Sequence, residues 1–251
     1  MNRHVFIATR TTSVERADLN TNIGKLDNYL RTAGWEPHYA EGKSSIFKAY
    51  ASLYESVSPA PDDQVILCHD DIEILVLPNV FNTLLNRWLS LDNVGFVGVA
   101  GTCVVTEKIF WHVCAQEHKA GGGGVFHGSG LNAMEYLNYG PARSAVSMDG
   151  VFLATTGRVL DKIQLHAPKG FEANWHGYDT FYTIQAFRLN LNNVIECGIL
   201  IRHGSGGTYD SELMRAVQGL HTIFKEELPY SCSPLPDFVL ATHSRAGLGE
   251  S

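Results

Sequence analysis

Short apolar runs alternate with segments of helical periodicity over the first hundred residues. The runs at 4–9, 36–40 and 65–69 have the length and composition of buried strands. Between them, apolar residues recur every three or four positions, as on one face of a helix. These are Ile23, Leu26, Tyr29 and Leu30, and then Ile46, Tyr50, Leu53 and Val57. This β-α-β-α-β order predicts parallel strands with helices on both faces of the sheet.

Polar residues and proline predict where these helices begin. Either Thr21 or Asn22 is expected to cap the first helix, and either Ser44 or Ser45 the second, because their side-chain oxygens can accept from free backbone N–H groups. Pro78 suits a first helical turn, so we expect a third helix to begin there.

The pattern is less regular in the second part of the chain. A buried strand is expected at 94–100, and the elements predicted after it are a strand at 109–114, a strand at 145–154 interrupted at 149–150, helices at 157–163 and 180–189, a strand at 193–202, and a helix capped by Ser211. We therefore predict one α/β domain over residues 1–228, with a Rossmann-like, mostly parallel central sheet flanked by helices. Residues 229–251, rich in Pro, Ser and Gly, predict a tail.

A glycine-rich stretch at 120–130 interrupts this pattern. It contains four consecutive glycines from Gly121 and two more around Ser129. Glycine loses the most backbone entropy on ordering, so the stretch predicts a mobile loop that could close over a site. A solvated surface loop without function is the alternative.

Composition limits the class of protein. The formal charge of −7 argues against a sequence-independent nucleic-acid binder, which would need a basic face. Five cysteines without a CxxC pair predict reduced thiols and a cytoplasmic location. The N-terminus is too short for a signal peptide, and no apolar stretch approaches the length of a membrane span, so none is expected.

Acidic residues follow directly after the strand at 65–69. Asp70 and Asp71 are unlike core residues, because ionised carboxylates are almost never buried unpaired. Ligands of open α/β sheets bind beyond the carboxyl ends of the strands, so the placement favours a metal and nucleotide site. An acidic turn that caps the next segment is the alternative.

Further polar residues follow other predicted strands, namely Asp149, Asp179 and His203. Mg²⁺ and Mn²⁺ prefer oxygen ligands, and Mn²⁺ also accepts imidazole. Asp71 and His203, completed by a diphosphate and water, would form a reasonable octahedral shell. The sequence has no HExxH, GxxxxGK[ST] or GxSxG motif, which disfavours zincins, P-loop enzymes and α/β-hydrolases.

An ordered set of segments resembles the GT-A-type glycosyltransferases, in particular family-2-like enzymes, over about residues 4–205. The triplet His69-Asp70-Asp71 stands where these enzymes carry their DXD-like motif. The other matching segments are 45–50, 146–154, 171–186 and 199–203. The resemblance implies a nucleotide-sugar half at 1–100 and an acceptor half at 101–228.

The resemblance also implies a role for each matching residue. Asp71 and His203 would bind the metal, and Asp179 would be the base that deprotonates the acceptor hydroxyl. The donor residues would be Thr9, Arg10, Glu41 and Asp70, and the acceptor residues Asp149, Gly150 and Trp175. Each also has a structural alternative: a helix cap for Asp179, an Asp-Gly turn for Asp149, a strand-end hydrogen bond for His203 and a solvated acid for Glu41.

Two departures from the family pattern bear on these roles. The triplet begins with His69 rather than an acid. The family often carries a second acid two residues after the base, and here that position is Phe181. Glu172 is the nearest alternative base in the sequence.

The function implied is a metal-dependent, inverting transfer of a sugar from a nucleoside-diphosphate sugar to a glycan or other hydroxyl acceptor. UDP is favoured over GDP and dTDP, with Mn²⁺ or Mg²⁺ as cofactor. One alternative is a nucleotidyltransferase, although the segment after the first strand lacks the expected basic, glycine-rich loop. The other is a non-catalytic sugar- or nucleotide-binding module, which Phe181 would favour.

Overall fold

The computed structural model describes residues 1–9, 13–128, 134–141, 144–171, 174–205 and 210–232. Within these ranges the helices are α1 (Ser13–Ala17), α2 (Asn22–Thr32), α3 (Ile46–Val57), α4 (Pro78–Leu89), α5 (Trp111–Glu117), α6 (Gly157–Leu160), α7 (Tyr178–Arg188) and α8 (Ser211–Phe224).

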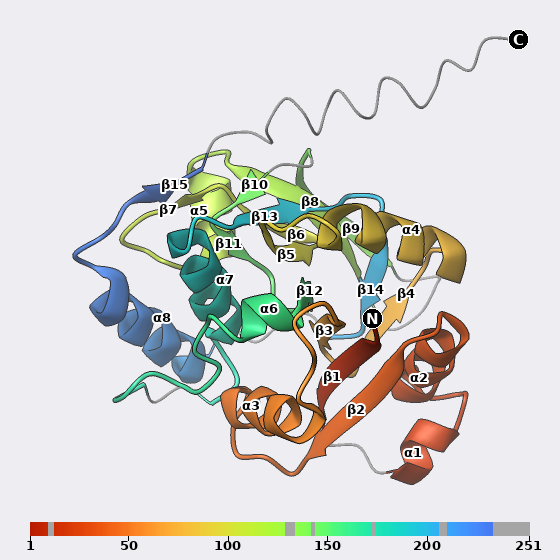
Figure 1. Ribbon diagram of the computed structural model, residues 1–251. Helices are drawn as coiled ribbons and strands as arrows, with labels where there is room; N and C mark the ends of the chain where they lie inside the picture. The colour runs from red at the N-terminus through yellow and green to blue at the C-terminus, as the bar shows by residue number, and fades with distance from the viewer. Residues whose placement is uncertain (10–12, 129–133, 142–143, 172–173, 206–209, 233–251) are drawn as a thin grey trace, which may run out of the picture.

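A seven-stranded sheet forms the centre of the molecule (Figure 1). Its strands, in spatial order, are β10 (Ser144–Ala145), β13 (Asn192–Ile195), β5 (Val94–Gly98), β12 (Phe152–Thr156), β3 (Gln64–Cys68), β1 (Arg3–Thr9) and β2 (Glu36–Glu41). Strands β2, β1 and β3 are parallel and are connected through α2 and α3, as predicted for the first part of the chain.

The sheet as a whole is mixed, so the prediction of a mostly parallel sheet is wrong. Strand β12 is antiparallel to both neighbours, β3 and β5, and β10 is antiparallel to β13. Strand β10 runs in the same direction as β12, because β13, to which β10 is antiparallel, is parallel to β5.

Two smaller sheets lie beside the central one. The larger contains β11 (Ser147–Met148), β6 (Ala100–Thr102), β8 (Gly121–His127), β14 (Ile201–His203), β4 (Ile72–Ile74) and, paired to β8, β9 (Glu135–Gly140). The smaller pairs β15 (Tyr230–Ser231) with β7 (Val104–Val105). Part of the predicted tail is therefore a strand; residues 233–251 lie outside the described residues.

Helices cover both faces of the central sheet. Residues of α3, α6, α7 and α8 pack with Phe6, Leu67 and Leu153 in one apolar cluster. Residues of α2 and α4 pack with Ile7 and Phe152 in another. The result is a layered α/β arrangement with one apolar core on each side of the sheet.

The predicted helix starts are largely confirmed. Thr21 accepts a hydrogen bond from Gly24 N, and Ser45 accepts one from Lys48 N. Helix α4 begins at Pro78. The cap of α8 is Asp210, not Ser211, because the Asp210 carboxylate accepts from the backbone N–H groups of the two residues that follow Ser211.

Two segments differ from the predicted elements. Residues 109–114 were expected to be a strand, but α5 begins at Trp111, and its buried residues Trp111, Cys114 and Ala115 have the spacing of a helix. The predicted strand at 193–202 is two strands, β13 and β14, in different sheets. Gly198 N donates to the Glu196 carboxylate in the turn between them.

The glycine-rich stretch is a buried strand, so the prediction of a mobile lid is wrong for residues 121–127. Gly123 has φ +76°, and a Cβ there would lie 1.9 Å from Val99 O. A Cβ on Gly124 would lie 2.6 Å from Leu137 O. These glycines allow β8 to approach its neighbours closely. Residues 129–133 lie outside the described residues.

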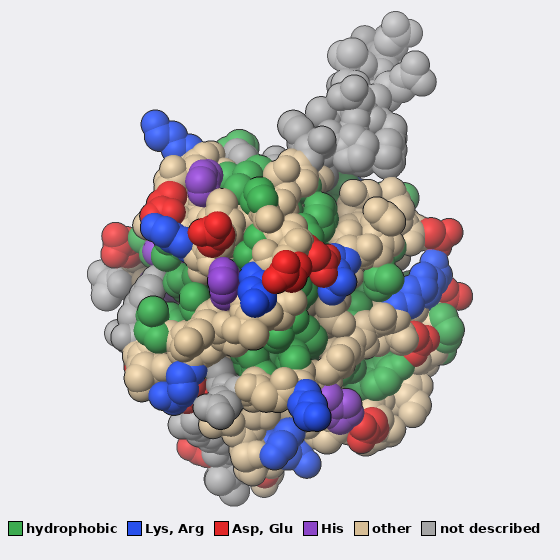
Figure 2. Space-filling view, turned by 90° about the vertical axis from the view of Figure 1, so that its left-hand side faces the viewer, with side chains coloured by type: hydrophobic (Ala, Val, Ile, Leu, Met, Phe, Trp, Pro, Cys, Tyr) green, Lys and Arg blue, Asp and Glu red, His purple; other side chains and the backbone are tan. Residues whose placement is uncertain are grey.

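Among the described residues, no helix is both long enough and apolar enough to cross a membrane. All five cysteines are thiols, and Cys68 and Cys114 are buried. Acidic and basic side chains are interspersed on the face drawn in Figure 2, and neither charge forms a continuous surface there.

Candidate active site

Three metal-binding side chains converge at the end of strand β3. His69 follows β3, Asp71 precedes β4, and His203 ends β14. Strands β14 and β4 are antiparallel with His203 opposite Ile72, which brings His203 beside Asp71. One ligand atom of each side chain lies within 4.8 Å of the others. We call these three residues the His–Asp–His cluster.

Hydrogen bonds fix the orientation of His69. Tyr178 donates its hydroxyl proton to Gly150 O at 2.7 Å, so its oxygen accepts from His69 Nε2 at 3.0 Å. With its proton on Nε2, His69 presents the lone pair of Nδ1 to the cluster. Nδ1 lies 3.1 Å from His203 Nε2.

His203 Nε2 is the centre of the cluster. Asp71 Oδ1 lies 3.2 Å away and Ser205 Oγ 3.1 Å away, in addition to His69 Nδ1. The Asp71, Ser205 and His69 atoms are all electron-rich and all lie beside His203 Nε2. A proton on His203 Nε2 can be donated to them, and a cation bound among these atoms would be stabilised by the same lone pairs.

The charges of the cluster follow from these contacts. Burial opposes ionisation of Asp71, but its hydrogen bond and charge interaction with His203 hold its pKa below the usual range. Burial also opposes protonation of His203, but the hydrogen bond that His203 donates to Asp71 raises the pKa of His203 above its ordinary value. Burial and the charge of His203 lower the pKa of His69.

The cluster fits a divalent transition metal. An octahedral ion with bonds of about 2.1 Å places adjacent ligand atoms roughly 3.0 Å apart. The separations of 3.1 Å and 3.2 Å within the cluster match that value. Two imidazoles and one carboxylate form a donor set suited to Mn²⁺, Fe²⁺ or Zn²⁺ more than to Mg²⁺, which prefers oxygen.

A first cavity of about 470 Å³ opens on one side of the cluster. Thr9, Asp70 and Asp71 contribute to its wall, with Ser205 and Glu212. Thr9 donates its hydroxyl to Asp70 Oδ2 at 2.5 Å, so these two predicted site residues lie together. Asp70 is directed to Thr9 and is not part of the cluster.

Another predicted donor residue, Glu41, is not found in this wall. Glu41 lies opposite Thr9 in the β1–β2 pair, but its exposed carboxylate forms an ion pair with Arg16, and it lines neither of the two cavities at the cluster. Arg10 lies outside the described residues, as does Glu172.

A second cavity of about 460 Å³ opens on the other side of the cluster. It shares His69, His203, Trp175 and His176 with the first cavity, so the two cavities meet there. Asp149, Gly150 and Asp179 line the second cavity alone. Thr9, Asp70 and Asp71 thus line the first cavity alone, and the two cavities adjoin at the shared residues.

Asp179 is held by backbone N–H groups. Gly150 N donates to Oδ2 at 3.0 Å and Thr180 N donates to Oδ1 at 2.7 Å. The helix cap is Gly177, so Asp179 lies within the first turn of α7. Burial and the charge of Asp149 nevertheless raise the pKa of Asp179 to about 7. A carboxyl group with such a pKa in a cavity is a candidate proton acceptor.

Asp149 has the turn chemistry that its sequence suggested and also faces the cavity. Its Oδ1 accepts from Val151 N at 3.1 Å, as in an Asx turn. Gly150 has no room for a side chain, because a Cβ would lie 2.2 Å from the Tyr178 hydroxyl. The turn therefore brings its backbone into direct contact with Tyr178 and Asp179.

Several residues of the site are not identified by the sequence alone. His69 stands out there only as a departure from the family pattern, and Tyr178, His112 and His127 have no predicted role. His69 and His127 lie at strand ends, whereas His112 and Tyr178 lie in helices α5 and α7. The partner of His69, His203, is 134 residues away in the sequence. Phe181 is a core residue, 4% exposed, which packs against Phe47 and Tyr182.

Comparisons with known proteins find solved structures that are similar at low sequence identity, among them the two described here. No family model matches the sequence, and no curated protein matches it. The A197 protein from STIV is similar over 82% of this chain and 86% of its own, at 10% identity and a TM-score of 0.43. GalNAc-T7, solved with UDP, GalNAc and Mn²⁺, is similar over 87% of this chain, at 12% identity and a TM-score of 0.49.

This chain covers 47% of the GalNAc-T7 chain, so it spans about half of that protein's length. Similarity at these values does not assign an activity. The geometry of the two cavities and the cluster between them is the basis for the function proposed below.

Proposed function

We propose that the protein is a metal-dependent glycosyltransferase that moves a sugar from a nucleoside-diphosphate sugar, with UDP favoured, to a hydroxyl acceptor. One observation carries this proposal: a metal-binding cluster lies where two cavities meet, with a candidate base in only one of them. A transferase needs two adjoining cavities, because the donor and the acceptor must bind side by side at the leaving group.

The donor would occupy the first cavity. Asp71, His203 and His69 would hold a divalent ion, which would stabilise the negative charge of the departing diphosphate. Thr9 and Asp70 would bind hydroxyl groups of the nucleoside, since the Asp70 carboxylate accepts hydrogen bonds. In this assignment residues 1–100 supply half of the residues that line the donor cavity. Arg10 and Glu41 remain proposed donor residues.

The acceptor would occupy the second cavity. Asp179 would take the proton of the acceptor hydroxyl while the oxygen of that hydroxyl forms a bond to the anomeric carbon of the donor sugar. The bond from that carbon to the diphosphate oxygen breaks, and the electron pair leaves with the nucleoside diphosphate. Attack from the side opposite the leaving group inverts the configuration. Asp149, the Gly150 backbone and Trp175 would position the acceptor sugar.

A thermal-shift screen of UDP-, GDP- and dTDP-sugars, each with and without Mn²⁺, tests the donor assignment. Ligand at 100 times its Kd adds about 2.7 kcal/mol to the free energy of unfolding, so the shift should be measurable. We expect a Mn²⁺-dependent shift for one nucleotide class that disappears in Asp71→Asn.

Asp27→Asn is the matched control, because Asp27 is also a partly buried, ion-paired carboxylate but lies away from both cavities. It should retain the shift of the wild type. A shift for no nucleotide would contradict the donor site, whereas a shift without release of UDP from any UDP-sugar would favour the non-catalytic binding module.

A further inference from the structure

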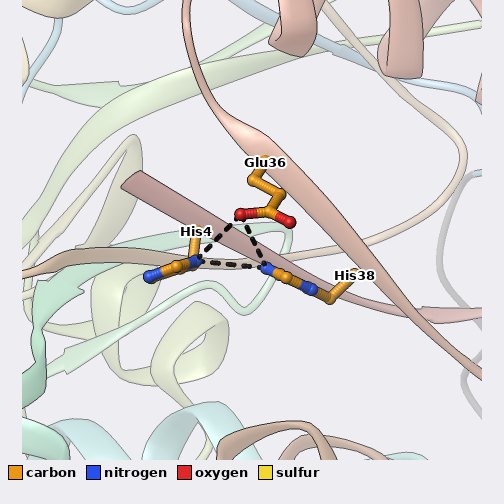
Figure 3. A group of neighbouring side chains, drawn as sticks. All are labelled: His4, Glu36 and His38. Atoms are coloured by element: carbon orange, nitrogen blue, oxygen red, sulfur yellow. Dashed lines mark hydrogen bonds and ion pairs between the residues drawn. The ribbon is translucent and has the colours of Figure 1, made fainter. Parts of the chain in front are cut away.

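A second group of metal-binding side chains lies at the opposite end of strand β1 from the candidate active site. His4 is near the start of β1, whereas Thr9 is at its end. His4 lies opposite Glu36 in the β1–β2 pair, and His38 is two residues further along β2. Alternate residues of a strand share one face of the sheet, so the three side chains project together (Figure 3).

The three ligand atoms are spaced for a single ion. His4 Nδ1 is 3.1 Å from His38 Nε2, and Glu36 Oε2 is 3.9 Å from the first nitrogen and 4.0 Å from the second. A point between these three atoms lies roughly 2.1 Å from each, which is the length of Zn–N and Zn–O bonds. All three therefore reach one zinc-sized ion without a change in the backbone.

A buried carboxylate lies behind His4, beyond hydrogen-bond distance but close enough for a charge interaction. Asp63 Oδ2 lies 3.7 Å from His4 Nε2, the ring nitrogen that faces away from Glu36 and His38. Asp63 is 4% exposed, and its carboxylate accepts from Asn2 N and Ala60 N, which stabilises the ionised form. Carboxylates behind a ligating histidine fix its tautomer and ring orientation in metal sites.

The facing ring nitrogens share either a proton or an ion. His4 Nδ1 and His38 Nε2 lie 3.1 Å apart and form an N–H···N hydrogen bond when one of them carries a proton, and a metal ion could replace that proton. Among the described residues, the ion pairs of Glu36 are those with His4 and His38. Glu36 therefore remains available to a cation.

We propose that His4, Glu36 and His38 form a structural Zn²⁺ site, completed by water in the fourth position. The site joins β2, the last strand of the central sheet, to its neighbour β1. None of the three residues lines the two cavities at the His–Asp–His cluster, so the site is separate from the proposed catalytic centre.

Calorimetric titration of the full chain with ZnCl₂ tests this proposal. We expect two equivalents to bind the wild type, one at each group of ligands. Asp71→Asn should remove or weaken one of them, and His38→Gln should remove the other. Glu36→Gln should lower the affinity for that second equivalent at least about tenfold, because loss of a residue that only supports a metal ligand already lowers affinity by this factor.

Glu55→Gln is the matched control, because Glu55 has the same 65% side-chain exposure as Glu36 and also faces a histidine, His166, at 3.3 Å. It should bind Zn²⁺ as the wild type does. Glu36 is exposed, so Glu36→Gln tests the site even if His38→Gln fails to fold. Unchanged Zn²⁺ affinity and stoichiometry in Glu36→Gln, or equal weakening in Glu55→Gln, would overturn the proposal.

Discussion

At the residue scale, Asp179 lies in an environment with opposing effects on its charge. Burial and the charge of Asp149 disfavour the carboxylate, whereas the N–H groups of Gly150 and Thr180 stabilise it. The resulting pKa of about 7 is suited to general-base catalysis near neutral pH, because the group is then both available and basic.

Replacement of this carboxylate should separate catalysis from binding. Asp179→Asn removes the proton acceptor but keeps its size, so we expect turnover to fall by about 10²–10⁴-fold with the affinity for UDP unchanged. Steady-state kinetics and calorimetry measure the two effects. Asp92→Asn, at an exposed ion pair with Arg158, is the control, and wild-type turnover in Asp179→Asn would show that another group is the base.

The same pKa makes stability depend on pH. The Asp179 pKa is raised from 3.8 in the unfolded chain to about 7 in the folded protein, so the folded state binds the proton more tightly. The stabilising contribution of this group is complete below about pH 4 and is lost as pH rises through about 7, a loss of up to about 4 kcal/mol.

Urea unfolding at several pH values measures this effect as the difference between wild type and Asp179→Asn, which lacks the titrating group. We expect the variant to gain stability relative to the wild type between about pH 4 and 7. A constant difference over this range would mean that Asp179 is ionised throughout.

At the element scale, glycine determines how strand β8 packs. Gly123→Ala should destabilise the protein strongly, because its Cβ would overlap Val99 O and its φ is +76°. Gly170 has φ +80°, but a Cβ there would have no atom within 4 Å, so Gly170→Ala isolates the effect of the backbone conformation. We expect a loss of about 1–2 kcal/mol for Gly170→Ala and about 1–3 kcal/mol more for Gly123→Ala.

Chemical denaturation of the two variants provides the comparison. Equal losses would show that β8 can move away from Val99 at little cost. The result would then support a flexible glycine-rich segment, as the sequence alone suggests, over a closely packed strand.

The sequence predicts those elements whose signals are local. Helices α2 and α3 carry their own caps, α4 begins at a proline, and all three have apolar faces, so their starts could be predicted within a residue or two. Strand β8 could not, because the need for glycine arises from Val99, between β5 and β6, and from Leu137 on β9. Helix α5 could not be predicted either, because its apolar spacing extends over fewer than two turns.

At the scale of the whole molecule, the site forms where distant segments meet. Asp71 and His203 were predicted through a family resemblance, and the structure places them 3.2 Å apart. The contribution of His69 depends on a hydrogen bond to Tyr178, 109 residues away, and could not be read from either local sequence. The division into two cavities likewise exists only in the folded chain.

The most direct test of this account is the affinity for UDP measured by calorimetry with and without Mn²⁺, in wild type, Asp71→Asn and the control Asp27→Asn. We predict that Mn²⁺ strengthens UDP binding at least about tenfold, or about 1.4 kcal/mol, in wild type and Asp27→Asn but not in Asp71→Asn. Equal affinity with and without the metal in the wild type would contradict a metal site that joins donor and acceptor cavities.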